Sequence, residues 1–330
     1  MVKDIRIIPI CVGGEMITEE DMYNRFPIDK NRFHVVIDRD NPEYLLVVIS
    51  HVLYRKSVMR EFRRYYSKNR IAIFEGDEAI SPDMNIFDYA ITYDDSMIYE
   101  DRVCHRPFSM FVAGGSEIQH GNQMSREQAQ KEYNRRKFCS FIYSNSNAYH
   151  VRDDLFYEIS RYKKIDSLGK HLNNMGNHPD RENENWFASS LKAKREYRFS
   201  ICAENGRMSG YTSEKIISAF LAGSIPIYWG NPNVVKEFNP EAFINCNDTV
   251  DVIKAIREIE ENRDLWVEMV TAQWQTDAQI KILRDQEKKY TDFINHIFDQ
   301  DIGDAKRCPT TTAASYYADF ALGCIDRELI

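Results

Sequence analysis

The sequence predicts an α/β protein built from two Rossmann-like domains, and three observations indicate this fold class. The chain has 330 residues, of which 43% are hydrophobic, so it can form two domains of ordinary size. In both halves, short apolar runs alternate with stretches of helical periodicity, which is the pattern of parallel strands covered by helices. Runs such as Tyr44–Ser50 and Ile225–Trp229 are apolar throughout, which is typical of strands buried on both faces.

The first half is expected to contain four strands, at Ile5–Cys11, Tyr44–Ser50, Arg70–Glu75 and Tyr89–Thr92. Between the second and third strands, apolar side chains recur at helical spacing through the basic segment 56–68, which predicts a helix with a basic outer face. The polar segment 114–137 changes the character of the chain, and we interpret it as a linker or a mobile insertion. The first domain is therefore placed at residues 1–136.

The second domain is placed at residues 137–300, and it too alternates strands with helices. Helices are expected at Asp153–Lys164, Trp186–Lys194, Thr249–Glu260, Asp264–Thr271 and Asp277–Phe298, and a strand is expected to open the domain at Phe138–Ser144. Residues 301–330 form a C-terminal tail with a short helix near Ala314–Leu322. Whether this tail packs back on the first domain is left open by the sequence.

The stretch from Tyr197 to Asp248 carries the most information. It is expected to run strand, loop, helix, strand, loop, strand, and its helix opens at Thr212-Ser213-Glu214. A loop before a helix offers free backbone N–H groups and the positive end of the helix dipole, which suits a phosphate. Lys215 lies in the first turn, where a cation opposes the dipole, so its presence indicates an anionic ligand. The alternative is that Lys215 is merely solvated.

Composition excludes several classes of function. The formal net charge of −8 argues against nucleic-acid binding, which depends on neutralising phosphates. The seven cysteines are scattered without a paired or metal-binding spacing, which favours reduced thiols in a cytoplasmic protein. There is no apolar run of transmembrane length and no signal-peptide pattern, so we expect no membrane association beyond a peripheral one. The histidines are dispersed and no Asp-x-Asp motif is present, so no metal is expected.

A series of short motifs is the most specific signal in the chain. In order they are Ala203-Glu204-Asn205, Tyr211, Ser213-Glu214-Lys215, Ile225-Pro226-Ile227-Tyr228-Trp229-Gly230, Phe238-Asn239-Pro240 and Phe243-Ile244. This series resembles the donor-binding core of the α-1,3/4-fucosyltransferases, glycosyltransferase family 10, and the chain looks like a soluble bacterial-type member. Ala203 stands where the family has Phe, and Thr212-Ser213 stand where it has Val-Thr. Both departures leave the polar groups in place.

The resemblance implies a fold, a reaction and two substrates. The fold would be GT-B, in which two Rossmann-like domains face a cleft, the N-terminal one binding the acceptor and the C-terminal one GDP-fucose. The reaction would be inverting α-1,3-fucosyl transfer from GDP-β-L-fucose to the N-acetylglucosamine or glucose of Galβ-GlcNAc-type acceptors such as N-acetyllactosamine, making Lewis-type glycans. No cofactor or metal would be required. The choice between 1,3 and 1,4 linkage stays open.

The resemblance also implies a catalytic carboxylate. Glu78-Ala79-Ile80-Ser81-Pro82-Asp83, followed by Asn85-Ile86-Phe87-Asp88-Tyr89-Ala90, resembles the family's Glu-Asn-x-x-Pro-Asp/Asn stretch and its continuation. The glutamate of that stretch is the family's proposed general base, which assigns the role to Glu78. Asp77 stands where the family has Gly, so a shift of the base by one residue to Asp77 remains open.

Donor-binding roles follow from the same motifs. Lys215 and Lys170, the latter in Leu168-Gly169-Lys170, would neutralise the diphosphate. Asn205 and Tyr211 would hydrogen-bond the diphosphate or ribose. Glu214 would bind fucose or ribose hydroxyls or steady the oxocarbenium charge, while Glu204 and Ser213 would support the loop.

Two other functions remain open at this point. One is a GT-B transferase that uses a different nucleotide sugar. The other is a non-catalytic module that binds a nucleotide sugar or a glycan, which the carboxylate and lysine motifs count against.

Overall fold

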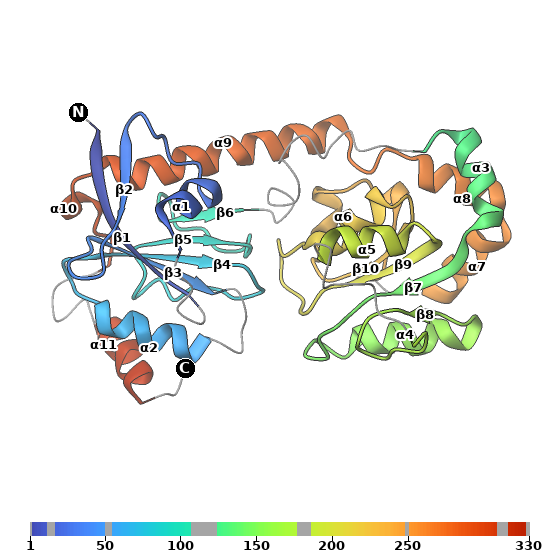
Figure 1. Cartoon of the computed structure of the whole chain (residues 1–330), viewed down its shortest axis with the longest axis horizontal. Helices are drawn as coiled ribbons and strands as arrows, with labels where there is room; N and C mark the ends of the chain where they lie inside the picture. The colour runs from blue at the N-terminus through green and yellow to red at the C-terminus, as the bar shows by residue number, and fades with distance from the viewer. Residues whose placement is uncertain are drawn as a thin grey trace. The chain divides into compact units, whose positions relative to one another are not determined.

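The computed structural model describes residues 2–11, 17–49, 55–106, 124–176, 186–247, 251–308 and 316–327. The chain divides into two compact units, one made of Met1–Arg106 with Asp285–Ile330 and the other of Pro107–Arg284. We call them unit 1 and unit 2. In each unit a parallel sheet is covered by helices (Figure 1).

Unit 1 contains a sheet of six described strands in the order β2-β1-β3-β4-β5-β6, and all neighbours pair in parallel. The strands are β1 (Lys3–Ile10), β2 (Phe33–Ile37), β3 (Tyr44–Ile49), β4 (Ile71–Gly76), β5 (Tyr89–Thr92) and β6 (Val103–His105). The described helices of this unit are α1 (Glu19–Arg25), α2 (Arg55–Tyr65), most of α9 (Asp277–Asp299), α10 (Ile302–Ala305) and α11 (Tyr316–Asp326).

The continuous apolar run of β3 is explained by burial on both of its faces. Leu45 and Val47 lie in one hydrophobic cluster with side chains of α2 and α11. Tyr44 points to the other face, where its ring lies 5.2 Å from that of Phe298 in α9. Figure 1 shows α2 and α11 side by side below this sheet and α9 along its opposite face. Helices on both faces require an apolar residue at every position of the strand.

Unit 2 contains a sheet of five described strands in the order β11-β10-β9-β7-β8, again parallel throughout. The strands are β7 (Lys137–Phe141), β8 (Asp166–Ser167), β9 (Tyr197–Ala203), β10 (Ile225–Trp229) and β11 (Ile244–Asn245). The described helices are α3 (Arg126–Arg135), α4 (Val151–Tyr162), α5 (Trp186–Lys194), α6 (Glu214–Leu221), α7 (Val252–Glu261), α8 (Arg263–Thr271) and the start of α9.

Strand β9 lies inside this sheet and contributes to two hydrophobic clusters. Phe199 and Ile201 join the cluster that includes side chains of α3, α4, α7 and α8. Cys202 points to the other cluster, with Ile216 and Ile217 of α6. The alternation follows from the period of two in a strand. Helix α6 is the next element after β9, so the loop between them starts at the carboxyl edge of the sheet.

The bounds of the units differ from the expected domain ranges 1–136, 137–300 and 301–330. Part of the expected linker forms helix α3 (Arg126–Arg135) in unit 2, where Tyr133 packs on Trp266 of α8 with ring centroids 5.7 Å apart. Residues 285–299 of α9 belong to unit 1, where Arg106 donates a hydrogen bond to Tyr290. Residues 107–123 lie outside the described residues.

The sequence missed α1, β2 and β6. The expected last strand of the core stretch is also shorter, because Pro240 starts a 3-10 turn (Pro240–Ala242) that leaves β11 with two residues. The described part of the tail includes α11, which packs on α2 in unit 1. Among the described residues, no helix has both the length and the apolar character needed to cross a membrane.

Candidate functional site

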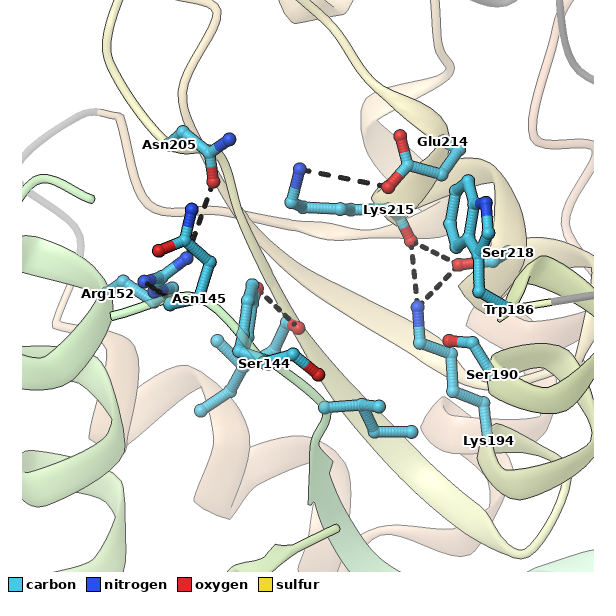
Figure 2. A pocket seen from close by; sticks show the side chains of 13 residues that line it. Ser144, Asn145, Arg152, Trp186, Ser190, Lys194, Asn205, Glu214, Lys215 and Ser218 are labelled. Carbon is cyan, nitrogen blue, oxygen red and sulfur yellow. Dashed lines mark hydrogen bonds and ion pairs between the residues drawn. The ribbon is translucent and has the colours of Figure 1, made fainter. Parts of the chain in front are cut away.

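A pocket of about 200 Å³ lies in unit 2, at the carboxyl ends of β7 and β9. Its lining comes from the segment after β7, from α4, α5 and β9, from the loop after β9, and from the first turns of α6 (Figure 2). Ligands of open α/β sheets bind at this edge, where the loops that follow the strands converge. The residues that line the pocket are Ile142, Tyr143, Ser144, Asn145, Arg152, Trp186, Ser190, Lys194, Ile201, Asn205, Glu214, Lys215 and Ser218.

Lys215 is held in place by a buried carboxylate. Its Nζ lies 3.1 Å from Oε2 of Glu204 and 3.0 Å from the Ser213 hydroxyl. Glu204, fully buried at the end of β9, also accepts hydrogen bonds from the Ser213 backbone N–H and hydroxyl. Burial raises the pKa of Glu204, and the nearby Lys215 charge opposes that rise. Glu204 and Ser213 therefore fix the ammonium group at the pocket.

Gly230 makes room for this carboxylate. A Cβ at position 230 would lie 2.3 Å from Cγ of Glu204, and the backbone of Gly230 has a φ of +154°. Both observations favour glycine, because an L side chain rarely adopts this conformation and would collide with Glu204. Ser213 in turn is the N-cap of α6, since its side chain accepts from the Lys215 backbone N–H.

Arg152 is a second cation of the pocket, and the sequence did not reveal it. Its side chain is 1% exposed and lies over the Tyr143 ring, 4.5 Å from the centroid. It donates hydrogen bonds to the Asn145 carbonyl (2.6 Å) and to Oδ1 of Asn205 (3.4 Å). The only ion pair that reaches it within the described residues is a 3.9 Å approach of its Nε to Asp153, beyond hydrogen-bond distance.

Burial lowers the pKa of the Arg152 guanidinium, and the nearby Asp153 carboxylate opposes that effect. A buried cation without a close carboxylate is unfavourable unless a ligand supplies negative charge. The sequence did contain a signal for it. Arg152 lies in the first turn of α4, where it opposes the helix dipole as Lys215 does in α6.

Lys194 is a third cation of the pocket. It is 5% exposed, and its Nζ donates to the backbone carbonyl of Lys215 (3.2 Å) and to the hydroxyl of Ser218. Burial lowers the pKa of Lys194. In Figure 2 its ammonium group lies on the side of Trp186, whereas that of Lys215 lies on the side of Asn205. The two lysines thus serve different ends of the pocket.

The structure brings together some of the residues predicted from sequence and separates others. Asn205, Glu214 and Lys215 line the pocket. Tyr211 is 2% exposed in the core and is not part of the lining. Lys170 is exposed after β8 and is likewise not part of the lining. Its neighbour Gly169 has a structural reason to be glycine, because a Cβ there would lie 1.8 Å from the Tyr143 carbonyl oxygen.

The carboxylates predicted for catalysis lie in unit 1, directly after β4. Asp77 forms an ion pair with Arg25 at 2.7 Å, and Arg25 also contacts the buried Glu75 at 2.8 Å. Glu78 is half-buried, and its backbone carbonyl accepts from the Ile80 N–H. Asp77 is therefore engaged in an ion pair, and both carboxylates lie at the carboxyl end of the same strand. Among the described residues, no three His, Cys, Asp or Glu side chains are grouped to hold a metal ion.

Comparison with known proteins identifies relatives of this chain. The model of the glycosyltransferase family 10 (fucosyltransferase) C-terminal region matches residues 132–304. The alpha-(1,3)-fucosyltransferase FucT of Helicobacter pylori is 28% identical over 275 residues, which are 75% of this chain and 55% of that protein. GDP-fucose protein O-fucosyltransferase 3 of Xenopus tropicalis is 21% identical over 230 residues, which are 66% of this chain and 45% of that protein. The chain thus spans about half the length of these curated relatives.

Solved structures show the same fold. A crystal structure of an alpha1,3-fucosyltransferase superposes with a TM-score of 0.66 at 19% identity, covering 94% of this chain and 94% of that one. A second, of an alpha1,3-fucosyltransferase with GDP-fucose, gives a TM-score of 0.61 at 19% identity and covers 88% of this chain and 91% of that one. The predicted fold class, two Rossmann-like α/β domains of the GT-B type, is confirmed.

Proposed function

The chain belongs to glycosyltransferase family 10, and from this membership we propose that it is an inverting α-1,3-fucosyltransferase that uses GDP-β-L-fucose. The acceptor in this proposal is the N-acetylglucosamine or glucose of a Galβ-GlcNAc-type oligosaccharide, and the product is a Lewis-type glycan. The observation that carries the donor half is the pairing of two pocket cations, Arg152 and Lys215, at the carboxyl ends of β7 and β9.

The diphosphate of the donor is proposed to bind between these two cations. Arg152 is buried, and its described ion pair, with Asp153, is a long one of 3.9 Å, whereas Lys215 is fixed by Glu204 and Ser213. Fixed cations stabilise charge that develops on a leaving diphosphate without reorganising during the reaction. A solved relative of the same fold was crystallised with GDP-fucose, which supports this donor class. Arg152 thereby takes the role that sequence reasoning gave to Lys170.

Hydroxyl and amide contacts complete the proposed donor site. Glu214 lines the pocket beside Lys215 and would accept hydrogen bonds from ribose or fucose hydroxyls. Asn205 shares its Oδ1 with Arg152 and would donate through its amide to the diphosphate. Tyr211 would act through packing, because its side chain is buried behind the loop.

The proposed chemistry is a single displacement. The acceptor hydroxyl oxygen bonds to C1 of fucose on the face opposite GDP, while the bond from C1 to the phosphate oxygen breaks. GDP leaves with the bonding electron pair, and the carboxylate of Glu78 takes the hydroxyl proton. Because one displacement occurs, the β-linked donor gives an α-fucoside. The family match and the position of Glu78 after β4 support this assignment.

The test is release of GDP from GDP-fucose, measured with and without N-acetyllactosamine, lactose and a type-1 chain. Acceptor-dependent release is the expected result, and the preferred acceptor begins to define the linkage. GDP-mannose and UDP-linked sugars serve as donor controls. Release from one of those donors, with none from GDP-fucose, would replace the donor assignment. Binding of GDP-fucose without turnover on every acceptor would oppose a transferase acting on this acceptor class.

A further inference from the structure

We propose that the α5 end of the pocket binds the nucleobase of the donor, with Lys194 reading a 6-oxopurine and Trp186 stacking on its ring. This inference rests on the proposed function, which supplies a guanine nucleotide as ligand. It goes beyond that function because it assigns residues to base selection that the family motifs do not include.

One end of the pocket is suited to phosphate and the other is not. Arg152, Asn145 and Asn205 cluster on one side of the pocket, and Trp186, Ser190 and Lys194 lie on the opposite side (Figure 2). The side chain of Lys215 turns toward the first group because Glu204 and Ser213 bind its ammonium. If Arg152 and Lys215 hold the diphosphate, the α5 side must bind one of the two groups that the diphosphate joins, either the nucleoside or the sugar.

The α5 side fits the nucleoside better than the sugar. The anomeric carbon must be reached by an acceptor, so the sugar requires an open position. The Lys194 side chain is at least nine-tenths buried, so an acceptor would not reach a sugar bound beside it. A base can bind at such a position, because it takes no part in the reaction. Trp186 is 51% exposed at the same end, although large aromatic side chains are usually buried. An exposed indole beside a pocket offers a stacking surface for a base.

Lys194 has the donors that a 6-oxopurine needs. Its ammonium carries three N–H groups, and two acceptors, the Lys215 carbonyl and the Ser218 hydroxyl, are found within the described residues. The remaining N–H can be offered to the pocket that the side chain lines. Guanine presents two acceptors, O6 and N7, on one edge, and lysine is one of the residues that pair with them. Adenine presents an amino group in place of O6, which a buried ammonium rejects.

Binding measurements with three nucleotides test this assignment. Dissociation constants of GDP, IDP, ADP and inorganic pyrophosphate are compared for the wild type and Lys194→Met, with Lys192→Met as the matched control. Lys192 lies on the same helix but is exposed. We expect the wild type to prefer GDP and IDP over ADP by about 10-fold or more, in line with one hydrogen bond from a charged donor. In Lys194→Met, GDP and IDP weaken by about 10-fold while ADP and pyrophosphate are unchanged.

A second variant separates the stacking of the base on Trp186 from its hydrogen bonding to Lys194. Trp186→Ala should weaken GDP, IDP and ADP alike by roughly 5-fold or more, because stacking tolerates any base, and should leave pyrophosphate binding unchanged. Equal loss of GDP and pyrophosphate in Lys194→Met would make Lys194 a phosphate contact and overturn the inference. So would a wild type that binds ADP as tightly as GDP, a result that needs no variant to fold.

The outcomes distinguish this inference from the proposed function. A wild type that binds GDP, with Lys194→Met binding it equally well, overturns the base assignment and leaves the fucosyltransferase proposal standing. A wild type that binds none of the nucleotides overturns both. If Lys194 only tied α5 to α6, its replacement would shift the melting temperature without changing the ratio of GDP to ADP affinity.

Discussion

Glu78 is the residue on which the proposed proton transfer depends. The change Glu78→Gln removes the base but keeps the size and polarity of the side chain. We expect kcat to fall by about 10²- to 10⁴-fold, the range for loss of a general base, while GDP-fucose affinity stays unchanged because the donor pocket lies in unit 2. The measurement is acceptor-dependent GDP release together with a GDP-fucose titration.

The control for this prediction is Asp77→Asn. Asp77 is paired with Arg25, so its replacement should lower the melting temperature more than the turnover number. A Glu78→Gln protein with wild-type turnover, accompanied by an Asp77→Asn protein without turnover, would move the base to Asp77.

The two candidate second cations, Arg152 and Lys170, are separated by a matched pair of variants. Arg152→Met should weaken both GDP and pyrophosphate binding by about 10-fold or more, because hydrogen bonds to charged groups contribute roughly 1.5–3 kcal/mol each. Lys170→Met should leave both affinities unchanged, since Lys170 is exposed and is not among the residues that line the pocket. Titration of both ligands measures this. The reverse ranking would restore the role that the sequence motif gave to Lys170.

At the scale of elements, α3 is linked to the proposed donor site through its last residues. Arg136, the C-cap of α3, donates hydrogen bonds to the carbonyls of Ala222 and Gly223, which follow α6. Glu132 receives hydrogen bonds from Arg136 and Arg135, at 2.8 Å and 2.7 Å. These contacts hold the C-terminal end of the helix whose N-terminal end carries Glu214 and Lys215. The expected linker is thus part of the support of the pocket.

The stability of this support should depend on pH through Glu132. Hydrogen bonds from Arg135 and Arg136 lower the pKa of Glu132 to about 2, below its reference value of 4.5. A depressed carboxyl pKa stabilises the fold above the unfolded value, and that contribution is lost as the pH falls from about 4.5 to about 2. Glu132→Gln should therefore lower the free energy of unfolding at pH 7 by about 1–3 kcal/mol, which is measured as a lower melting temperature. The difference in melting temperature between the variant and the wild type should vanish near pH 2.

Glu127→Gln is the control on the same helix. Glu127 pairs with Lys131 through side chains that are 79% and 74% exposed, and such surface pairs contribute little. Its replacement should leave the melting temperature unchanged at every pH. A Glu132→Gln difference that persisted unchanged to pH 2 would mean that packing of the side chain, and not its charge, supports α3.

The elements show why some features can be predicted from sequence. Strands such as β3 and β10 are buried on both faces, so their apolar runs identify them directly. β2 was missed because its sequence, Phe33–Ile37, contains an exposed histidine and only two of its five residues are buried. In the site, Glu214 and Lys215 lie in one local motif, whereas Arg152 and Lys194 come from helices elsewhere in the chain. Their burial at the same pocket marks both as its cations, and for Arg152 the sequence adds one signal, its place in the first turn of α4.

At the scale of the whole molecule, the two units differ in a property that makes them experimentally separable. All four tryptophans, Trp186, Trp229, Trp266 and Trp274, lie in residues 107–284, which form unit 2. Three of them are at most 6% exposed, so unfolding of unit 2 must change their surroundings. Tryptophan fluorescence therefore reports unit 2 alone, whereas far-ultraviolet circular dichroism reports the helices and strands of both units.

This separation gives a direct test that the donor site belongs to unit 2. A ligand that binds only the folded state stabilises it by about 2.7 kcal/mol when present at 100 times its dissociation constant. We expect GDP at that level to raise the melting temperature reported by tryptophan fluorescence, and Arg152→Met to remove the shift at the same GDP concentration. A circular dichroism signal that melts in two steps should show the shift in the tryptophan-linked step. A shift confined to the other step would place GDP binding in unit 1 and contradict the role of Arg152 and Lys215.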